Sequence, residues 1–268
     1  MPVVAVSVSP GAARSIAFEA FGVRVRVTGD TQAVIERVRA TLPPGARLCD
    51  SSGAEVSFAV LAQDDDTYRV MRGRSAVSSG LELELALKLL ETELHMYVGL
   101  HAPDSIFVHA GVVAHRGKTI VIPGLSFSGK STLVSELVRA GAAYYSDEFA
   151  VLDQRGLVHP YPTALSLRNG SGPNGADSAP LGRPDDPPLA IGAVVFTTYR
   201  ADAQWEPNRL SPGRGALAML ANTLAALERS QEAVRAITSA LDGAIILEGE
   251  RGEARQLSPQ LLDALDDE

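Results

Sequence analysis

The sequence contains little cysteine, few aromatic residues and no excess of positive charge. Its single cysteine, Cys49, excludes an internal disulfide bond and favours a reducing compartment. Lysine and arginine total 24 against 32 aspartate and glutamate residues, which gives a formal net charge of −8. A broad nucleic-acid-binding surface needs clustered basic side chains, and this composition does not favour one. We therefore predict no nucleic-acid partner.

Long uninterrupted apolar runs are also lacking. The leucine-rich stretch 81–100 carries five charged side chains and is typical of an amphipathic helix packed on a core. Residues 1–8 are apolar but lack the basic start and long apolar segment of a signal peptide. The sequence thus predicts a cytoplasmic protein without a membrane partner. Its 268 residues, 46% of them hydrophobic, can bury a sizeable core in one large domain or two small ones.

What the chain does contain is a glycine-rich motif. Residues 124–132 read GLSFSGKST and match G-x-x-x-x-G-K-[ST] at every fixed position. The preceding run, 119–122, is β-branched and apolar like a buried strand, and the run 133–138 has apolar residues at helical spacing. Strand, glycine loop and helix are the context that a phosphate-binding loop requires. The alternative is a chance match in a glycine-containing turn.

The loop would bind phosphate through its backbone and two side chains. Successive N–H groups form an anion-binding concavity, and the helix that begins there adds its positive end. Lys130 can reach the β- and γ-phosphates, and the Ser131 hydroxyl can bind a Mg²⁺ ion. The candidate nucleotide-binding residues are Gly124, Ser126, Phe127, Ser128, Gly129, Lys130, Ser131 and Thr132.

Two carboxylates follow the motif closely. Asp147 and Glu148 come directly after a short expected strand, 143–146. Carboxylates at the carboxyl end of a strand beside a phosphate loop are well placed to address the metal and the reacting phosphoryl group. Adjacent residues on a strand face opposite sides, so both can face the site only if the strand has ended before them. The alternatives are a turn-capping aspartate and an exposed glutamate.

The pattern of expected elements divides the chain at residue 104. We predict a smaller α+β N-terminal subdomain over 1–104, with a structural or substrate-recognition role, and a catalytic domain over 105–268. In the first part we expect strands at 21–27, 55–61 and 68–71, a helix at 31–42 capped by Thr31, and a helix at 81–99. In the second we expect a hairpin of strands 105–114 and 118–122, later strands at 190–198 and 243–247, and helices at 213–227, 231–241 and 258–265.

These motifs together resemble a known family. Residues 108–112 (VHAGV), the hairpin, the phosphate loop, a helix ending at Gly141 and then Ser146-Asp147-Glu148 are similar in order and spacing to the catalytic domain of HPr kinase/phosphorylase. That family has a His-Gly element before its glycine loop and an Asp-Asp pair soon after it. The short interval between Lys130 and Asp147 is a sharper match than the loop alone. The resemblance covers about 105–155 and weakens over 156–215.

The resemblance implies an α/β P-loop kinase domain with a mixed sheet like that of ATP-dependent phosphoenolpyruvate carboxykinase. It implies ATP and Mg²⁺ as cofactors and phosphoryl transfer to a serine-type hydroxyl. Asp147 would be the catalytic base, Ser131, Glu148 and Asp147 the metal ligands, and His109 and Arg168 would lie near the phosphates. Ser166 stands where the family has a glutamate, and no glycine follows Arg168, so the phosphorylase direction does not carry over.

Several functions stay open at this point. The acceptor hydroxyl could belong to serine in a peptide or small protein, to free serine or to another small compound. A nucleotide-sensing regulator or an NTPase would need Lys130 and Ser131 but not Asp147 as a base. A carboxykinase-like enzyme would need an additional basic cluster, which the sequence does not show. His109 could instead be a histidine whose hydrogen bonds are made within the hairpin, and Arg168 could be a surface arginine. Whether the protein forms a homo-oligomer is also open.

Overall fold

The computed structural model describes residues 14–64, 66–124, 128–163 and 182–265. The chain divides into two compact units, Met1–Val98 and Gly99–Glu268. The sequence-based prediction places the division after residue 104, a little beyond the end of the long helix that leads out of the first unit. No described helix combines the length and the apolar character that crossing a membrane requires.

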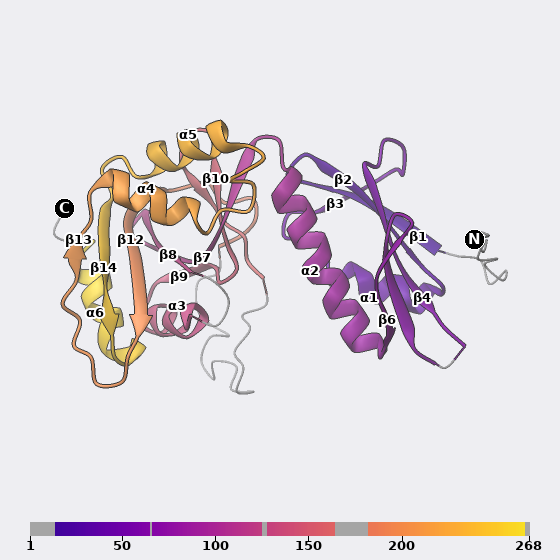
Figure 1. Cartoon of the computed structure of the whole chain (residues 1–268), viewed down its shortest axis with the longest axis horizontal. Helices are drawn as coiled ribbons and strands as arrows, with labels where there is room; N and C mark the ends of the chain where they lie inside the picture. The colour runs from indigo at the N-terminus through magenta and orange to yellow at the C-terminus, as the bar shows by residue number, and fades with distance from the viewer. Residues whose placement is uncertain (1–13, 65, 125–127, 164–181, 266–268) are drawn as a thin grey trace. The chain divides into compact units, whose positions relative to one another are not determined.

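The N-terminal unit is built on a six-stranded mixed sheet (Figure 1). The strand order is β3-β1-β2-β4-β5-β6, in which β2 and β4 are parallel and the other neighbours antiparallel. Its elements are β1 (Arg14–Ala20), β2 (Val23–Gly29), α1 (Gln32–Arg39), β3 (Arg47–Cys49), β4 (Val56–Ala62), β5 (Tyr68–Arg72), β6 (Ser75–Leu81) and α2 (Leu83–His101).

Local sequence explains most of this unit. In β2 the valines at 23, 25 and 27 are fully buried, while the arginines between them are not, as expected for a strand with one face on a core. Thr31 caps α1 by accepting a 3.2 Å hydrogen bond from the backbone N–H of Val34, which confirms the predicted cap. The ring of Tyr97 on α2 packs edge-on against Phe58 of β4, so α2 covers the sheet.

The C-terminal unit is built on an eight-stranded mixed sheet. Its strand order is β11-β10-β7-β8-β12-β14-β13, with β9 paired to β7. Strands β8, β12 and β14 are parallel, and the remaining pairs are antiparallel. The elements are β7 (Ser105–His115), β8 (Lys118–Pro123), α3 (Lys130–Arg139), β9 (Ala143–Ser146), β10 (Phe149–Asp153), β11 (Val158–His159), β12 (Ala190–Tyr199), β13 (Asn208–Arg209), α4 (Pro212–Leu220), α5 (Ser230–Ala240), β14 (Ile245–Arg251) and α6 (Ala254–Asp263).

Helices cover both faces of this sheet, which gives three layers (Figure 1). Alternate residues of the central strands belong to two separate core clusters: Val112, Val121 and Val194 pack with α4 and α5, and their neighbours Val113, Ile122 and Val195 pack with α3 and α6. The continuous apolar runs of β8 and β12 follow from this burial on both sides. The mixed α/β character expected from the sequence is therefore present in both units.

The C-terminal unit also departs from the expected elements. The helix expected over 213–227 ends at Leu220, because the backbone beyond it hydrogen-bonds to the edge of β7: Leu224 N–H donates to Phe107 O at 2.9 Å and His109 N–H to Asn222 O at 2.7 Å. The strand expected to end at 247 continues to Arg251, and α6 begins at Ala254 instead of Ser258. Strand β10, which was not predicted, pairs with β7.

Candidate nucleotide-binding and phosphoryl-transfer site

The glycine motif joins the end of β8 to the start of α3. Gly124 donates its N–H to the carbonyl of His109 at 3.1 Å, which ties the start of the loop to β7. A Cβ on Gly124 would lie 2.9 Å from Ser128 Oγ, so the close approach of these two residues requires glycine. Of the predicted nucleotide-binding residues, Ser126 and Phe127 lie outside the described residues.

Helix α3 begins with its amides directed at the loop. Gly129 stands at the N-cap with φ +82°, a left-handed conformation that glycine adopts without strain. Within the described residues, no side chain accepts a hydrogen bond at this cap. The first turn carries Lys130, Ser131 and Thr132, of which Lys130 is buried, Ser131 partly buried and Thr132 exposed. Unsatisfied N–H groups and the positive helix end make this position favourable for an anion.

The Lys130 ammonium lies within electrostatic range of the Asp147 carboxylate. Only 9% of the lysine is exposed, and burial lowers the pKa of its ammonium. The negative charge of Asp147 partly offsets that effect on the pKa, so the two side chains interact electrostatically. The structure therefore links the lysine predicted to bind phosphate to the aspartate predicted to be the base.

Asp147 is oriented by two hydroxyl groups. Its Oδ1 atom accepts a hydrogen bond from the Tyr144 hydroxyl at 2.7 Å and another from Thr163 Oγ1 at 3.2 Å. Tyr144 also lies 3.0 Å from the carbonyl of Thr163. Burial, followed by the charge of Asp147, raises the pKa of Tyr144, so its phenol is a proton donor at neutral pH. Neither residue was predicted from the sequence: Tyr144 lies in the strand just before Asp147, and Thr163 reaches it from 16 positions further along the chain.

Asp147 and Glu148 can both face the site only if the strand before them has ended, and it has. Strand β9 stops at Ser146, whose hydroxyl accepts the N–H groups of Glu148 at 3.1 Å and Phe149 at 3.0 Å. This turn separates the two carboxylates from an extended strand. Against the larger, lowering effect of burial, the charge of Asp147 raises the pKa of Lys130, and the charge of Glu148 raises the pKa of His109. The condition set by strand geometry for a paired role is therefore met.

His109 lies in β7 beside these groups. Its ring packs on Phe149 at a centroid distance of 4.7 Å and an interplanar angle of 35°. Burial lowers the pKa of His109, and the ammonium of Lys130 lowers it further, while the charge of Glu148 and a hydrogen bond with the Glu148 backbone raise it. The net effect is a neutral imidazole at pH 7. The described contacts of the His109 imidazole thus run to Phe149 and to the backbone of Glu148 rather than to Asp147.

Arg251 lies at the loop and was not predicted from the sequence. It is 4% exposed, its Nη2 donates to the carbonyl of Gly129 at 3.2 Å and its Nη1 to the carbonyl of Gly252 at 3.0 Å. Its guanidinium carbon lies 5.5 Å from the centre of the Tyr199 ring. Burial lowers the pKa of Arg251. The available signal was its position at the carboxyl end of a strand parallel to β8, but the strand was expected to end four residues earlier, at 247.

Other predicted residues are less central or not described. Arg168 lies outside the described residues. His159, expected to be structural, sits on β11 with Nε2 3.5 Å from Asp153 Oδ2. An open groove of about 640 Å³ lies next to the loop, on the side of β12 and β14. It is lined by residues that include Pro123, Thr197 and Glu248.

The metal-binding candidates form a small set. No group of three or more His, Cys, Asp or Glu side chains within the described parts of the chain is arranged to hold a metal ion. Mg²⁺ is commonly bound by one or two carboxylates together with substrate phosphates and water. Ser131 at the loop and the carboxylates of Asp147 and Glu148 are a donor set of that kind, so the residues present fit this ion.

Comparison with known proteins finds a distant structural relationship. No protein-family model and no curated protein matches the sequence. Among solved structures, the chain is similar to the Hpr(Ser) kinase/phosphatase from Coxiella burnetii, with 9% sequence identity over 60% of this chain and 94% of that chain. The TM-score of 0.30 is too low to establish a shared fold. The similarity is a distant structural relationship only.

Proposed function

We propose that this protein is an ATP- and Mg²⁺-dependent kinase that transfers the γ-phosphoryl group to a hydroxyl, serine in a peptide or small protein being the acceptor we favour. The observation that carries the proposal is a buried lysine at a helix N-terminus that interacts electrostatically with an aspartate oriented by two hydroxyl groups. The glycine motif and the resemblance of residues 105–155 to HPr kinase/phosphorylase support the same function.

Each residue has a role that follows from its environment. The amides at the start of α3 and the Lys130 ammonium would bind and neutralise the phosphates. Asp147, fixed by Tyr144 and Thr163, would orient the acceptor hydroxyl and receive its proton. Phosphoryl transfer depends mainly on positioning and charge neutralisation, which these groups provide. Ser131, Asp147 and Glu148 would hold Mg²⁺, which neutralises charge that develops on the phosphoryl oxygens when bound.

His109 is assigned a positioning role in this proposal. Its imidazole is neutral at pH 7 and contacts the backbone of Glu148, so it would fix the turn that carries the two carboxylates. A neutral ring leaves the positive charge of the site to Lys130 and Arg251.

The test is to follow the label from γ-³²P-ATP. We expect wild-type protein with Mg²⁺ to transfer label to an added serine peptide, and the Asp147→Asn variant to bind ATP normally but lose transfer by about 100- to 10,000-fold. Label recovered in free serine or another small alcohol would keep the kinase and change its acceptor. Label recovered only in inorganic phosphate, at the same rate in both proteins, would refute the kinase and favour an NTPase or a nucleotide sensor.

A further inference from the structure

Arg251 carries buried hydrogen-bonding capacity that the described protein does not use. Its Nε atom is buried and has no hydrogen-bond partner among the residues that the structure describes. The guanidinium contacts two carbonyls and the ring of Tyr199, and Glu253 acts on it at longer range. A buried cation with an unpaired donor costs free energy unless a partner is supplied. The positive end of α3 and the Lys130 ammonium lie nearby and add to this cost.

Two hydroxyl groups that line the same cavity as Arg251 are also buried without a described hydrogen-bond partner. Ser128 Oγ and Thr197 Oγ1 are both buried without a hydrogen-bond partner within the described part of the chain. They line one small cavity together with Gly129, Lys130 and Arg251. A Cβ on Gly129 would lie 2.6 Å from Arg251 Nη2, so the arginine approaches the loop as closely as glycine permits. Donors from the loop, from β12 and from β14 thus converge on the start of α3.

The sheet order places these donors on one flank of the loop and the reactive groups on the other. The loop follows β8, and β7 with its neighbours β9 and β10 lies on one side of that strand. That side supplies His109, Asp147 and Glu148. Strands β12 and β14 lie on the opposite side and supply Thr197 and Arg251. The open groove lined by Thr197, Glu248 and Glu250 also lies on this second side, where it leaves room for the nucleoside.

We propose that Arg251, assisted by Thr197, binds the phosphates of the nucleotide that are not transferred. This inference rests on the proposed function. A phosphate chain that crosses the loop with its terminal phosphorus toward Asp147 turns its α- and β-phosphates toward β12 and β14. The planar guanidinium then uses its unpaired Nε for a phosphate oxygen, a geometry that arginine supports and lysine does not. ADP retains these phosphates, so Arg251 contributes to the binding of ADP and ATP alike.

The experiment is calorimetric titration of the whole protein with MgADP and with the Mg²⁺ complex of a non-hydrolysable β,γ-imido analogue of ATP. We expect Arg251→Met to weaken both ligands by about tenfold or more, with the ratio of the two affinities unchanged. Arg251→Lys should recover only part of the loss. Arg139→Met removes an equal charge from the far end of α3 and should leave both affinities unchanged.

The outcomes separate this inference from the function on which it rests. Wild-type protein that binds neither ligand would overturn both. Wild-type protein that binds both, with Arg251→Met weakening only the triphosphate or neither ligand, would overturn the role of Arg251 alone. Thermal melts of the ligand-free proteins check folding. Should Arg251→Met not fold, Arg251→Lys and Thr197→Val decide: equal weakening of both ligands supports the proposal, and unchanged affinities in these two variants refute it.

Discussion

The Tyr144 hydroxyl donates a 2.7 Å hydrogen bond to Oδ1 of Asp147. The tyrosine is buried in the core cluster that packs against α3 and α6, and burial raises the pKa of its phenol. The carboxylate is therefore anchored to the hydrophobic core through a donor that does not ionise at neutral pH. A catalytic base on a turn gains fixed orientation from such a support, because a small misplacement of the reacting groups is costly.

Replacing Tyr144 with phenylalanine tests this support. The variant keeps the ring in the core and removes only the donor to Asp147. We expect turnover in the phosphoryl-transfer assay to fall by about 10- to 100-fold, while ATP affinity stays unchanged. Tyr145→Phe is the matched control, because Tyr145 faces the opposite core cluster. Equal losses in both variants would indicate general loosening of the site instead of a specific role for Tyr144.

A substitution at Gly129 tests whether the loop is the nucleotide site. Gly129→Ala introduces strain at φ +82° and a Cβ that would lie 2.6 Å from Arg251 Nη2. Gly117 in the β7–β8 turn has φ +80° with nothing within 4 Å of the added Cβ, so Gly117→Ala carries the strain alone. We expect Gly117→Ala to lose about 1–2 kcal/mol of stability and Gly129→Ala at least as much, measured by denaturant unfolding.

Nucleotide binding should separate the two alanine variants. Gly129→Ala is expected to lose most ATP affinity in calorimetric titration, because the added atom displaces Arg251 and narrows the start of α3. Gly117→Ala is expected to bind ATP like the wild type. Normal ATP affinity in a folded Gly129→Ala protein would argue that phosphate does not bind at this helix.

The pH dependence of stability provides a test of His109. Burial lowers its pKa in the folded protein, with Lys130 acting in the same direction and Glu148 against it, whereas the unfolded histidine has a pKa of about 6.5. Above that pH both states are neutral and His109 contributes no pH dependence. As the pH falls through about 6.5, the unfolded chain takes up a proton that the folded state does not, so the unfolding free energy decreases.

The comparison is between wild type and His109→Gln from pH 8 to pH 5 by urea unfolding. Other groups titrate in both proteins, so the difference between the two curves isolates His109. We expect the wild type to lose stability relative to the variant below about pH 6.5. Parallel curves over the whole range would show that the histidine titrates normally in the folded state.

The sequence predicted the elements whose cause is local. The Thr31 cap, the β7–β8 hairpin and the strand-loop-helix around Lys130 each depend on residues within a few positions of one another. Part of the candidate site could also be predicted from the sequence, because a short strand and two carboxylates lie soon after the glycine motif. These features need no knowledge of the partner strands.

The features that the sequence did not predict depend on distant contacts. The helix after Pro212 ends at Leu220, because residues 222–224 bond to the edge of β7, more than 100 positions earlier in the chain. Arg251 reaches Gly129 only because β14 pairs with β12, and β12 with β8. Strand order is not encoded in any local pattern. A buried arginine at the loop therefore looked in the sequence like an ordinary charged residue after a strand.

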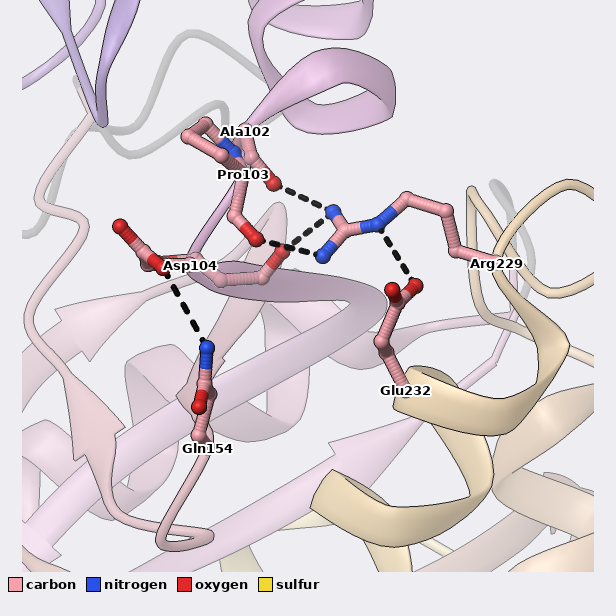
Figure 2. A network of polar contacts seen from close by, with 7 residues as sticks. Ala102, Pro103, Asp104, Gln154, Arg229 and Glu232 are labelled. Carbon is pink, nitrogen blue, oxygen red and sulfur yellow. Dashed lines mark hydrogen bonds and ion pairs between the residues drawn. The ribbon is translucent and has the colours of Figure 1, made fainter.

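Arg229 joins the segment before β7 to the start of α5, and its removal should destabilise the C-terminal unit. Figure 2 shows its guanidinium directed at the carbonyls of the 102–105 segment and at the carboxylate of Glu232. Nη2 donates to Pro103 O at 2.7 Å, Nη1 donates to Ala102 O and, at 3.2 Å, to Ser105 O, and Nε lies 3.0 Å from Glu232 Oε2. Carbonyls near a strand start lose their partner if the arginine is removed.

We expect Arg229→Met to lower the unfolding free energy by about 2–3 kcal/mol, measured by urea unfolding. Glu232→Gln breaks only the ion pair with an exposed carboxylate and should cost less than about 1 kcal/mol. The double variant should then resemble Arg229→Met alone, because the carbonyl contacts dominate. Equal costs for the two single substitutions would mean that the ion pair, and not the capture of the 102–105 backbone, holds this junction together.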